Sequence, residues 1–292
     1  MHQDKILTVV MNKVIRFIHI SDTHLRDDPE ARMYGINVYD AALKAIEAIN
    51  RSTLPFDFVV HTGDVTSVDG TQKEYELAAG IFKKIETPMY FVTGNHDNAS
   101  LMRRIIKFGE KQDLSTDDNR LFYIFEVNGH KFLVLDAKTT KEEDPHGRLP
   151  QEQLDKLDGI IADTQGHITI FNHYPTIVPD CAWLKKSMTI LNADAILKIF
   201  NKYSSKITGV FSGHIHQGTV LIRDGILYSS VGSTFVNFRN APADDDVIFF
   251  SHGVGYFNHV TIEESSIEIK QYAFENGTSS FIKTREEMLK SI

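Results

Sequence analysis

Three early units of this chain share one order: an apolar strand, a polar loop rich in Asp, Asn, Gly and His, and then a helical pattern. The strands are predicted at residues 14–20, 56–62 and 89–93. After the first loop, apolar residues recur at i, i+3 and i+4 from Val38 to Ile49, which is typical of one buried helix face. Helices are also expected at about 72–85 and about 99–108. Strands that alternate with helices indicate an α/β fold.

Further strands and helices follow this beginning. Asn128-Gly129 between two apolar runs predicts a tight hairpin turn. Helices are expected at about 150–162 and 190–203, a strand at 167–173, and successive strands over 218–273. The polar residues gather at strand ends, where α/β proteins place their ligands.

The predicted fold is one domain of mixed α/β (α+β) class, with two sheets flanked by helices. We assign it to residues 13–275, after an N-terminal tail at 1–12 and before a peripheral C-terminal segment at 276–292. That last segment is polar with a helix-like end, which makes it a candidate for contact with a second copy in a homo-oligomer.

Composition excludes some classes of function. With 292 residues, 42% of them hydrophobic, and a net charge of −8, the chain is expected to bury a sizeable core and to lack the basic stripe of a long nucleic-acid track. Its single cysteine, Cys181, rules out a disulfide framework within the chain. The first apolar run spans six residues, too short for a signal sequence or a membrane span, and no later run is long enough, so a cytoplasmic location is expected.

Five separate loops supply residue types that bind metal ions, and each loop directly follows an apolar strand. The candidates are Asp22 with His24, Asp64, Asn95 with His96 and Asp97, His173, and His214 with His216. Taken singly, an Asp after a strand is more often a turn or helix-cap residue, and a lone His is more often a hydrogen-bonded residue without a metal. If the strands lie side by side, all five loops meet at one edge, which favours a shared metal site.

The spacing of these residues has a physical reason. Residues i and i+2 of an extended segment point the same way, about 6.5 to 7 Å apart, so Asp22 and His24 can approach one site together. His214 and His216 can each reach a different ion of a pair that lies about 3.5–4 Å apart. The two oxygens of one carboxylate can bridge both ions, and Asp64 is the natural candidate. Mixed nitrogen and oxygen donors suit Zn, Mn, Fe, Co or Ni better than Ca.

In order along the chain, the motifs D-x-H, G-D, G-N-H-D, a His after a strand, and G-H-x-H span residues 22 to 216, and this set resembles the calcineurin-like metallophosphoesterase family. The stretch "ISDTHLR", the pair Tyr34-Gly35 and the "GHIH" loop look most like the branch of class III cyclic-nucleotide phosphodiesterases and glycerophosphodiesterases. The resemblance implies a four-layer α/β/β/α sandwich, in which two mixed sheets are flanked by helices.

The resemblance also implies a role for each matching residue around a binuclear metal centre. The first ion is expected on Asp22, His24, Asp64 and His216, and the second on Asp64, Asn95, His173 and His214. His96 is expected to face the phosphate as a catalytic residue that is not a ligand. Asp97 is expected either to orient His96 or to hold the turn, and both roles stay open.

These residues predict an enzyme, a metal-dependent phosphoric diester hydrolase that acts on small phosphodiesters such as cyclic nucleotides or glycerophosphodiesters. Two divalent ions, two aspartates and one bridging hydroxide leave a charge of about +1, which matches a singly charged diester. The neutral oxygen of Asn95 preserves that charge, whereas an Asp would cancel it. The hydroxide is expected to attack phosphorus in line, and His96 to donate a proton to the leaving alkoxide or to hold a phosphoryl oxygen.

Two positions depart from the family's patterns. Tyr174 in "NHYPT" stands where members often have a second His, and we expect it to change the pocket rather than the metal ligands. The stretch "GDVTSVDG" lacks the Arg of the pattern that protein phosphatases use, which argues against that activity.

Arg26, Tyr34 and His252 are further candidates for the substrate side, and a solvated loop is the alternative for Arg26 and Tyr34.

Two other functions stay open at this point. A phosphomonoesterase or a nucleotide pyrophosphatase is the alternative on the same scaffold. A metal-free scaffold that only binds a partner is the third hypothesis, and the intact residues at every predicted ligand position argue against it.

Overall fold

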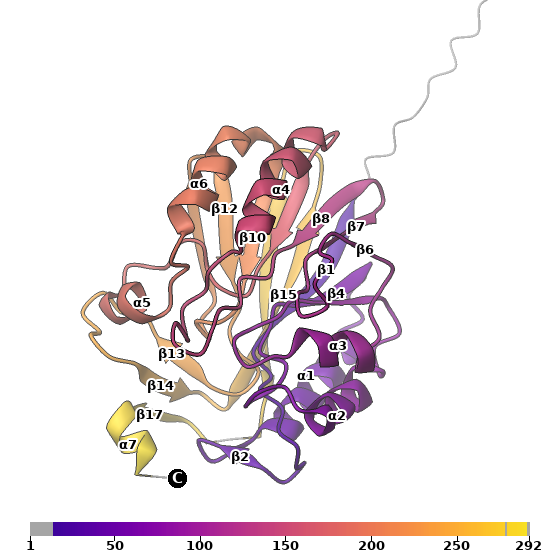
Figure 1. Ribbon diagram of the computed structural model, residues 1–292. Coiled ribbons are helices and arrows are strands. Elements are labelled where there is room, and N and C mark those ends of the chain that lie inside the picture. The colour runs from indigo at the N-terminus through magenta and orange to yellow at the C-terminus, as the bar shows by residue number, and fades with distance from the viewer. Residues whose placement is uncertain (1–13, 278, 291–292) are drawn as a thin grey trace, which may run out of the picture.

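The computed structural model describes residues 14–277 and 279–290, and two mixed β-sheets form its centre (Figure 1). The first sheet has the strand order β16 (Ile267–Glu275), β15 (Val254–Ile262), β1 (Ile15–Ile20), β4 (Phe58–His61) and β5 (Met89–Phe91). The second has the order β11 (Thr219–Arg223), β12 (Ile226–Ser230), β10 (Ile207–Ser212), β9 (Ile168–Phe171), β8 (His130–Val134), β7 (Tyr123–Val127) and β6 (Gln112–Asp113). The predicted N-terminal tail at 1–12 lies outside the described residues.

Both sheets contain a parallel block. Strands β1, β4 and β5 run parallel, as do β8, β9, β10 and β12, while the other neighbours in the two sheets pair antiparallel. The predicted hairpin is confirmed, because β7 and β8 are antiparallel and Asn128 and Gly129 between them have φ of 52° and 83°. Parallel strands end at the same edge of a sheet, so the loops that follow them are presented together.

Helices form the outer layers of the molecule (Figure 1). Helices α1 (Val38–Arg51), α2 (Gln72–Phe82) and α3 (Ala99–Ile105) pack on the first sheet, and α4 (Gln151–Asp163) and α6 (Ala193–Lys202) pack on the second. Helix α1 begins where the Asn37 side chain accepts a hydrogen bond from the Asp40 N–H at 2.9 Å. The order helix, sheet, sheet, helix confirms the predicted four-layer α/β/β/α sandwich.

Aromatic side chains join the two sheets. Phe17 of β1 stacks on Phe58 of β4, with ring centroids 5.1 Å apart, and it meets rings of the second sheet edge-on. These rings belong to Phe132, Phe171 and Phe211, at 6.2, 5.6 and 5.3 Å. Burying one Phe side chain away from water stabilises the folded state by about 1.5–3 kcal/mol. This core gives the sheet edge above it a rigid base.

Several short elements lie outside the two main sheets, and the sequence did not predict most of them. They are β2 (Arg32–Met33), β3 (Ile36–Asn37), α5 (Ala182–Ser187), the 3-10 helix at Ser204–Lys206, β13 (Asn237–Arg239), β14 (Ile248–Ser251), β17 (Phe281–Thr284) and α7 (Arg285–Leu289). Strands β13, β14 and β17 form a third sheet, so part of the C-terminal segment pairs with β14. None of the helices in the described part of the chain is long and apolar enough to span a membrane.

Candidate metal centre

The five predicted loops meet at one edge of the two sheets, and hydrogen bonds to their backbones tie them together. The N–H groups of Asp22 and His24 donate to the carbonyls of Gly63 and Asp64, both at 3.0 Å, so the loops after β1 and β4 run side by side. Across the sandwich, the N–H of His214 donates to the Asp22 carboxylate at 3.1 Å. The fold thus joins loops that lie far apart in the sequence.

Two glycines allow this close approach. A Cβ on Gly94 would lie 2.2 Å from Oδ1 of Asp64. A Cβ on Gly63, whose φ is +99°, would lie 2.5 Å from Nδ1 of His173. No side chain fits at such distances, so the glycines of the G-D and G-N-H-D motifs are required by the packing around Asp64 and His173.

The backbone of the site is held in an unfavourable conformation at five candidate ligands. Left-handed φ values occur at Asp22 (56°), His24 (47°), Asp64 (53°), His214 (70°) and His216 (47°). A left-handed residue other than glycine costs roughly 1–2 kcal/mol, and such residues concentrate at functional sites. The surrounding fold therefore imposes these conformations at a cost in stability. Such strain is expected where a site depends on the direction of its side chains.

The candidate ligand side chains form two buried groups, within each of which the donor atoms lie within 4.8 Å of one another. The two groups are Asp22, His24 and His216, and Asp64, His173 and His214. A distance of 3.5 Å between Nε2 of His24 and Oδ2 of Asp64 links them. His24 and Asp64 also form a third group with His96. Asp64 therefore lies between the two groups, as the bridging hypothesis requires.

The histidine nitrogens show that these groups fit metal ions. Nδ1 of His173 lies 2.7 Å from the carbonyl of Thr62, and Nδ1 of His216 lies 2.9 Å from that of Val236, so each Nδ1 carries the proton. Each Nε2 lies 3.4 Å from a carboxylate oxygen, that of His173 from Asp64 and that of His216 from Asp22. Against the effect of burial, the charge and hydrogen bond of Asp64 raise the pKa of His173 to about 9, so a proton occupies the His173–Asp64 contact at neutral pH. Two acceptors facing each other in a buried site need a proton or a cation between them.

Further buried groups lack partners or carry unfavourable charge. Nε2 of His214 is buried and has no hydrogen-bond partner among residues 14–277 and 279–290. Burial lowers the pKa of His24 and of His214 well below the usual value, and that of His216 to about 4, so these rings stay neutral, the form that binds metal ions. Burial raises the pKa of Asp22 to about 7, opposed by His173 and reinforced by the nearby charge of Asp64. A cation would relieve this repulsion.

Asn95 and His96 both reach the centre from the loop after β5. Oδ1 of Asn95 lies 3.3 Å from Nε2 of His173, which places the amide oxygen at the second group. The N–H of His96 donates to Oδ1 of Asp64 at 3.0 Å, and its half-buried ring lies 5.1 Å from the ring of His24. Its Nδ1 lies 3.4 Å from the carbonyl of Val68, so Nε2 is left to face the pocket.

Asp97 holds the loops rather than the His96 ring. Its fully buried carboxylate accepts hydrogen bonds from the N–H groups of Val65, Thr66 and Gly94 at 3.2, 3.1 and 3.0 Å. The Tyr75 hydroxyl donates to it at 3.2 Å. These partners come from the loops after β4 and β5 and from α2, and they favour the turn role of Asp97 over the ring-orienting role.

The four residues proposed for the substrate side lie in different surroundings. Tyr34 is half-buried and lines the pocket above the metal centre. Tyr174 is fully buried and packs its ring at 5.0 Å from His173 and 4.7 Å from His214, behind the centre. Arg26 is half-buried and does not line that pocket. His252 is exposed beside Phe250, in the turn between β14 and β15, and does not line it either.

Two connected pockets open above the centre. The inner one, of about 170 Å³, has ligand side chains on its floor, among them Asp64, His214 and His216. The outer one, of about 390 Å³, shares Tyr34 and His96 with it. Phe238 lines both pockets, and the walls of the outer one also include Trp183, Phe249 and Arg285. Sequence reasoning singled out none of these four residues. These residues lie on α5, the third sheet and α7, and only the folded chain brings them together.

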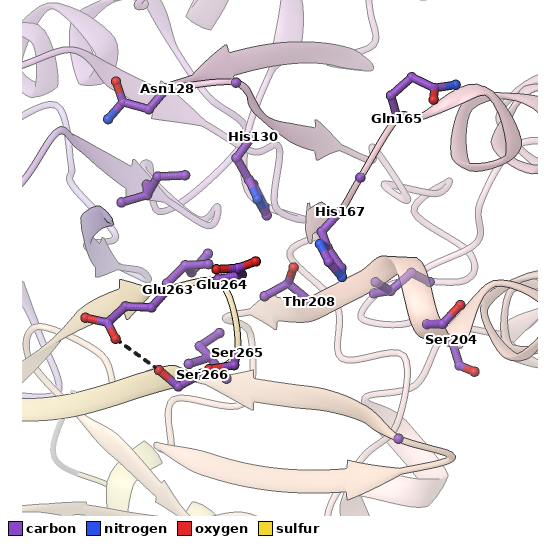
Figure 2. Close-up of a pocket in the computed structure, with 18 residues that line it drawn as sticks. Asn128, His130, Gln165, His167, Ser204, Thr208, Glu263, Glu264, Ser265 and Ser266 are labelled. Carbon is purple, nitrogen blue, oxygen red and sulfur yellow. Dashed lines mark hydrogen bonds between the residues drawn. The ribbon is translucent and has the colours of Figure 1, made fainter. Parts of the chain in front are cut away.

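A larger hollow of about 620 Å³ lies at the opposite end of the sheets from the metal centre, and Figure 2 shows the residues that line it. It opens where strands β8, β9 and β10 begin, and His130, His167, Glu263 and Glu264 are among the residues around it. Among residues 14–277 and 279–290, no close group of three potential metal ligands lies there. The chemistry of the described residues is therefore concentrated at the other end, where the parallel strands finish.

The fold and the site define a metal-dependent phosphoesterase. The sequence profile described as "Calcineurin-like phosphoesterase" matches residues 15–218, and the chain belongs to this family. The resemblance that the motifs indicated is thereby confirmed.

Relatives agree with this assignment. The chain is 26% identical over 235 residues to a 3',5'-cyclic adenosine monophosphate phosphodiesterase of Vibrio vulnificus, with 80% of each chain covered. It is 24% identical over 217 residues to a probable glycerophosphodiester phosphodiesterase of Arcobacter nitrofigilis, covering 74% of this chain and 77% of the relative. A solved dimetal phosphatase of Danio rerio shares the fold with a TM-score of 0.64, at 16% identity, over 92% of this chain and 98% of the other.

Proposed function

We propose that this enzyme hydrolyses small phosphodiesters, either cyclic nucleotides or glycerophosphodiesters, at a centre of two transition-metal ions. The observation that carries the proposal is the convergence of buried histidine nitrogens and carboxylate oxygens, acceptor against acceptor, directly below a pocket that His96 lines. The relatives described as cyclic adenosine monophosphate and glycerophosphodiester phosphodiesterases support the diester class.

Each ion would be held by one of the two groups, with Asp64 shared. Asp22, His24, Asp64 and His216 would hold the first, and Asp64, Asn95, His173 and His214 the second. Two divalent ions held there would polarise phosphoryl oxygens and lower the pKa of bound water. Asn95 would contribute a neutral oxygen, so two divalent ions with Asp22, Asp64 and one hydroxide would keep about one net positive charge for a singly charged diester. The identity of the metal pair, from Mn, Fe, Zn, Co or Ni, stays a prediction.

His96 is the residue proposed to act on the substrate itself. Its backbone is fixed by the hydrogen bond to Asp64, and its ring stands at the junction of the two pockets. With Nδ1 directed to the Val68 carbonyl, Nε2 can donate a proton to the leaving alkoxide or a hydrogen bond to a phosphoryl oxygen. Asp97 supports this arrangement by holding the loop in place, and Tyr34 lines both pockets together with His96.

Hydrolysis rates on two chromogenic substrates test the proposal. The metal-loaded protein is expected to cleave bis(p-nitrophenyl) phosphate, a diester, more efficiently than p-nitrophenyl phosphate, a monoester. A strong preference for the monoester would refute the diesterase function and favour a phosphomonoesterase. Absence of hydrolysis together with less than about one ion per chain would favour a metal-free scaffold. The cytoplasmic location and a homo-oligomer remain predictions.

A further inference from the structure

The outer pocket has walls of aromatic rings that continue from the metal centre. The ring of Phe238 stacks on that of His216, with centroids 4.1 Å apart and planes at 6°. Phe238 in turn meets Phe249 edge-on at 5.3 Å and Trp183 at 5.8 Å. Tyr34 extends the same aromatic wall, with its ring centroid 4.8 Å from that of Phe249. The apolar wall therefore begins at a candidate metal ligand and leads away from the phosphate position.

Other elements hold these rings in place. Trp183 is 4% exposed and its indole N–H donates to the carbonyl of Arg239 at 3.3 Å. Phe249 is 7% exposed and lies on β14, which pairs with β17. Met288 of α7 is buried and lines the same pocket. Helix α7 thus completes a wall of the outer pocket, and β17 supports β14 beside it.

A cation lies at the rim of this pocket. Arg285 lines the pocket and pairs with Asp246 at 3.2 Å, and both side chains are more than half exposed. An exposed pair of this kind is worth about 0–1 kcal/mol, so the guanidinium can turn to a ligand at little cost. A guanidinium stacks on aromatic rings and donates several hydrogen bonds, which suits a flat heterocycle with acceptor atoms at its edge.

We infer that the outer pocket is a specificity site that takes a planar aromatic group of the diester, of the size and polarity of a nucleobase. This inference rests on the proposed diester hydrolysis, and it selects among the substrates left open there. A volume of about 390 Å³ is in the range of small-molecule pockets, and stacked or edge-on rings match a flat group. A small polar group such as the glycerol moiety of a glycerophosphodiester would lose its hydrogen bonds to water against apolar walls and gain few in return.

The single tryptophan makes the inference testable by fluorescence, because Trp183 is the only indole in the chain and lies in the pocket wall. Adenosine monophosphate titrated into the metal-loaded protein is expected to change the Trp183 emission saturably. Glycerol 3-phosphate, which has the same phosphate without the base, is expected to inhibit diester hydrolysis while leaving the emission unchanged. Equal emission changes, or none with either ligand, would overturn the inference.

Two substitutions on one strand provide a matched comparison. Phe249→Leu removes a ring of the pocket wall and is expected to weaken adenosine monophosphate binding about five- to tenfold, since base stacking on an aromatic ring contributes on this scale. The neighbouring residue Phe250 does not line the pocket, so Phe250→Leu is expected to change the affinity for adenosine monophosphate less than about twofold. Equal effects of the two variants would contradict the specificity role. Thermal unfolding of both variants separates lost binding from lost folding.

Hydrolysis of bis(p-nitrophenyl) phosphate by the same preparations keeps the two proposals apart. If the protein hydrolyses bis(p-nitrophenyl) phosphate but its Trp183 emission does not distinguish adenosine monophosphate from glycerol 3-phosphate, the aromatic specificity site is refuted and the diesterase function stands. Selective binding of adenosine monophosphate without diester hydrolysis supports the specificity site and refutes the proposed function.

Discussion

Replacing Asp97 by asparagine tests how the loops that carry Asp64, Asn95 and His96 are held together. The Asp97 carboxylate accepts from three backbone N–H groups of the loops after β4 and β5, and from the Tyr75 hydroxyl. Both oxygens therefore face only donors. Asparagine keeps the shape of the side chain but converts one oxygen to an NH₂ group, which is itself a donor.

These contacts set the expected loss of folding free energy in Asp97→Asn. In either orientation of the amide, the NH₂ group opposes at least one backbone N–H, which is then buried without a partner at a cost of about 1–3 kcal/mol. The remaining bonds lose a charged acceptor, which removes roughly 1 kcal/mol each. We expect Asp97→Asn to lower the free energy of unfolding by about 3–5 kcal/mol, a large part of the 5–15 kcal/mol typical of a folded protein. Metal affinity is expected to fall as well, since the same loops carry ligands.

Urea unfolding of the metal-free protein measures the first effect directly. The matched control is Asp69→Asn, because Asp69 is 64% exposed and, within the described residues, pairs only with the 85% exposed Lys141, so its change should stay within about 1 kcal/mol. An Asp97→Asn protein that unfolds within about 1 kcal/mol of the native sequence would refute the role of Asp97 in holding the loops. Normal metal content in that variant would refute the coupling between the loops and the ligands.

Other substitutions test the remaining roles. His96→Ala is expected to retain its metal ions and to slow turnover about 10²–10⁴-fold, most strongly for poor leaving groups, in steady-state assays over a series of diesters; equal slowing across the series would point to phosphate binding instead of proton donation. Asn95→Ala is expected to lower the content of the second ion in mass-spectrometric metal analysis, and unchanged content with an unchanged rate would count against its assignment as a ligand. Gly94→Ala is expected to destabilise the fold and impair metal binding, because its Cβ would lie 2.2 Å from Asp64. In contrast, a Cβ on Gly159 in α4 would meet no atom of the described part of the chain within 4 Å, so Gly159→Ala is expected to raise stability by about 0.5–1 kcal/mol; equal melting temperatures of the two glycine variants would contradict the packing at the site.

The parts of the fold that could be predicted from sequence are those with a local signal. Apolar periodicity predicted α1 and its buried face from Val38 to Ile49. The Asn128-Gly129 pair predicted the hairpin between β7 and β8, and both residues adopt the left-handed φ that such a turn needs. Helix ends were less accurate: α2 ends at Phe82 and α3 at Ile105, each three residues before the predicted end.

The parts that could not be predicted depend on contacts between distant segments. Strand β17 has four residues and exists because it pairs with β14, so no local pattern marks it. The walls of the outer pocket come from Trp183, Phe238, Phe249 and Arg285, which no motif connects. Sequence reasoning identified the candidate ligands because each directly follows a strand. It offered Tyr34 for the substrate side, but its other choices there did not identify the aromatic wall.

Metal stoichiometry tests the central claim most directly. Metal analysis by mass spectrometry of protein saturated with Mn²⁺ or Zn²⁺, with diester hydrolysis measured on the same samples, is expected to show two ions per chain. Chelation should remove both ions and the activity together, and His216→Ala should lose one ion. Full hydrolysis by protein that holds less than about one ion per chain, or two ions in both the native sequence and His216→Ala, would contradict a centre of two ions built from these residues.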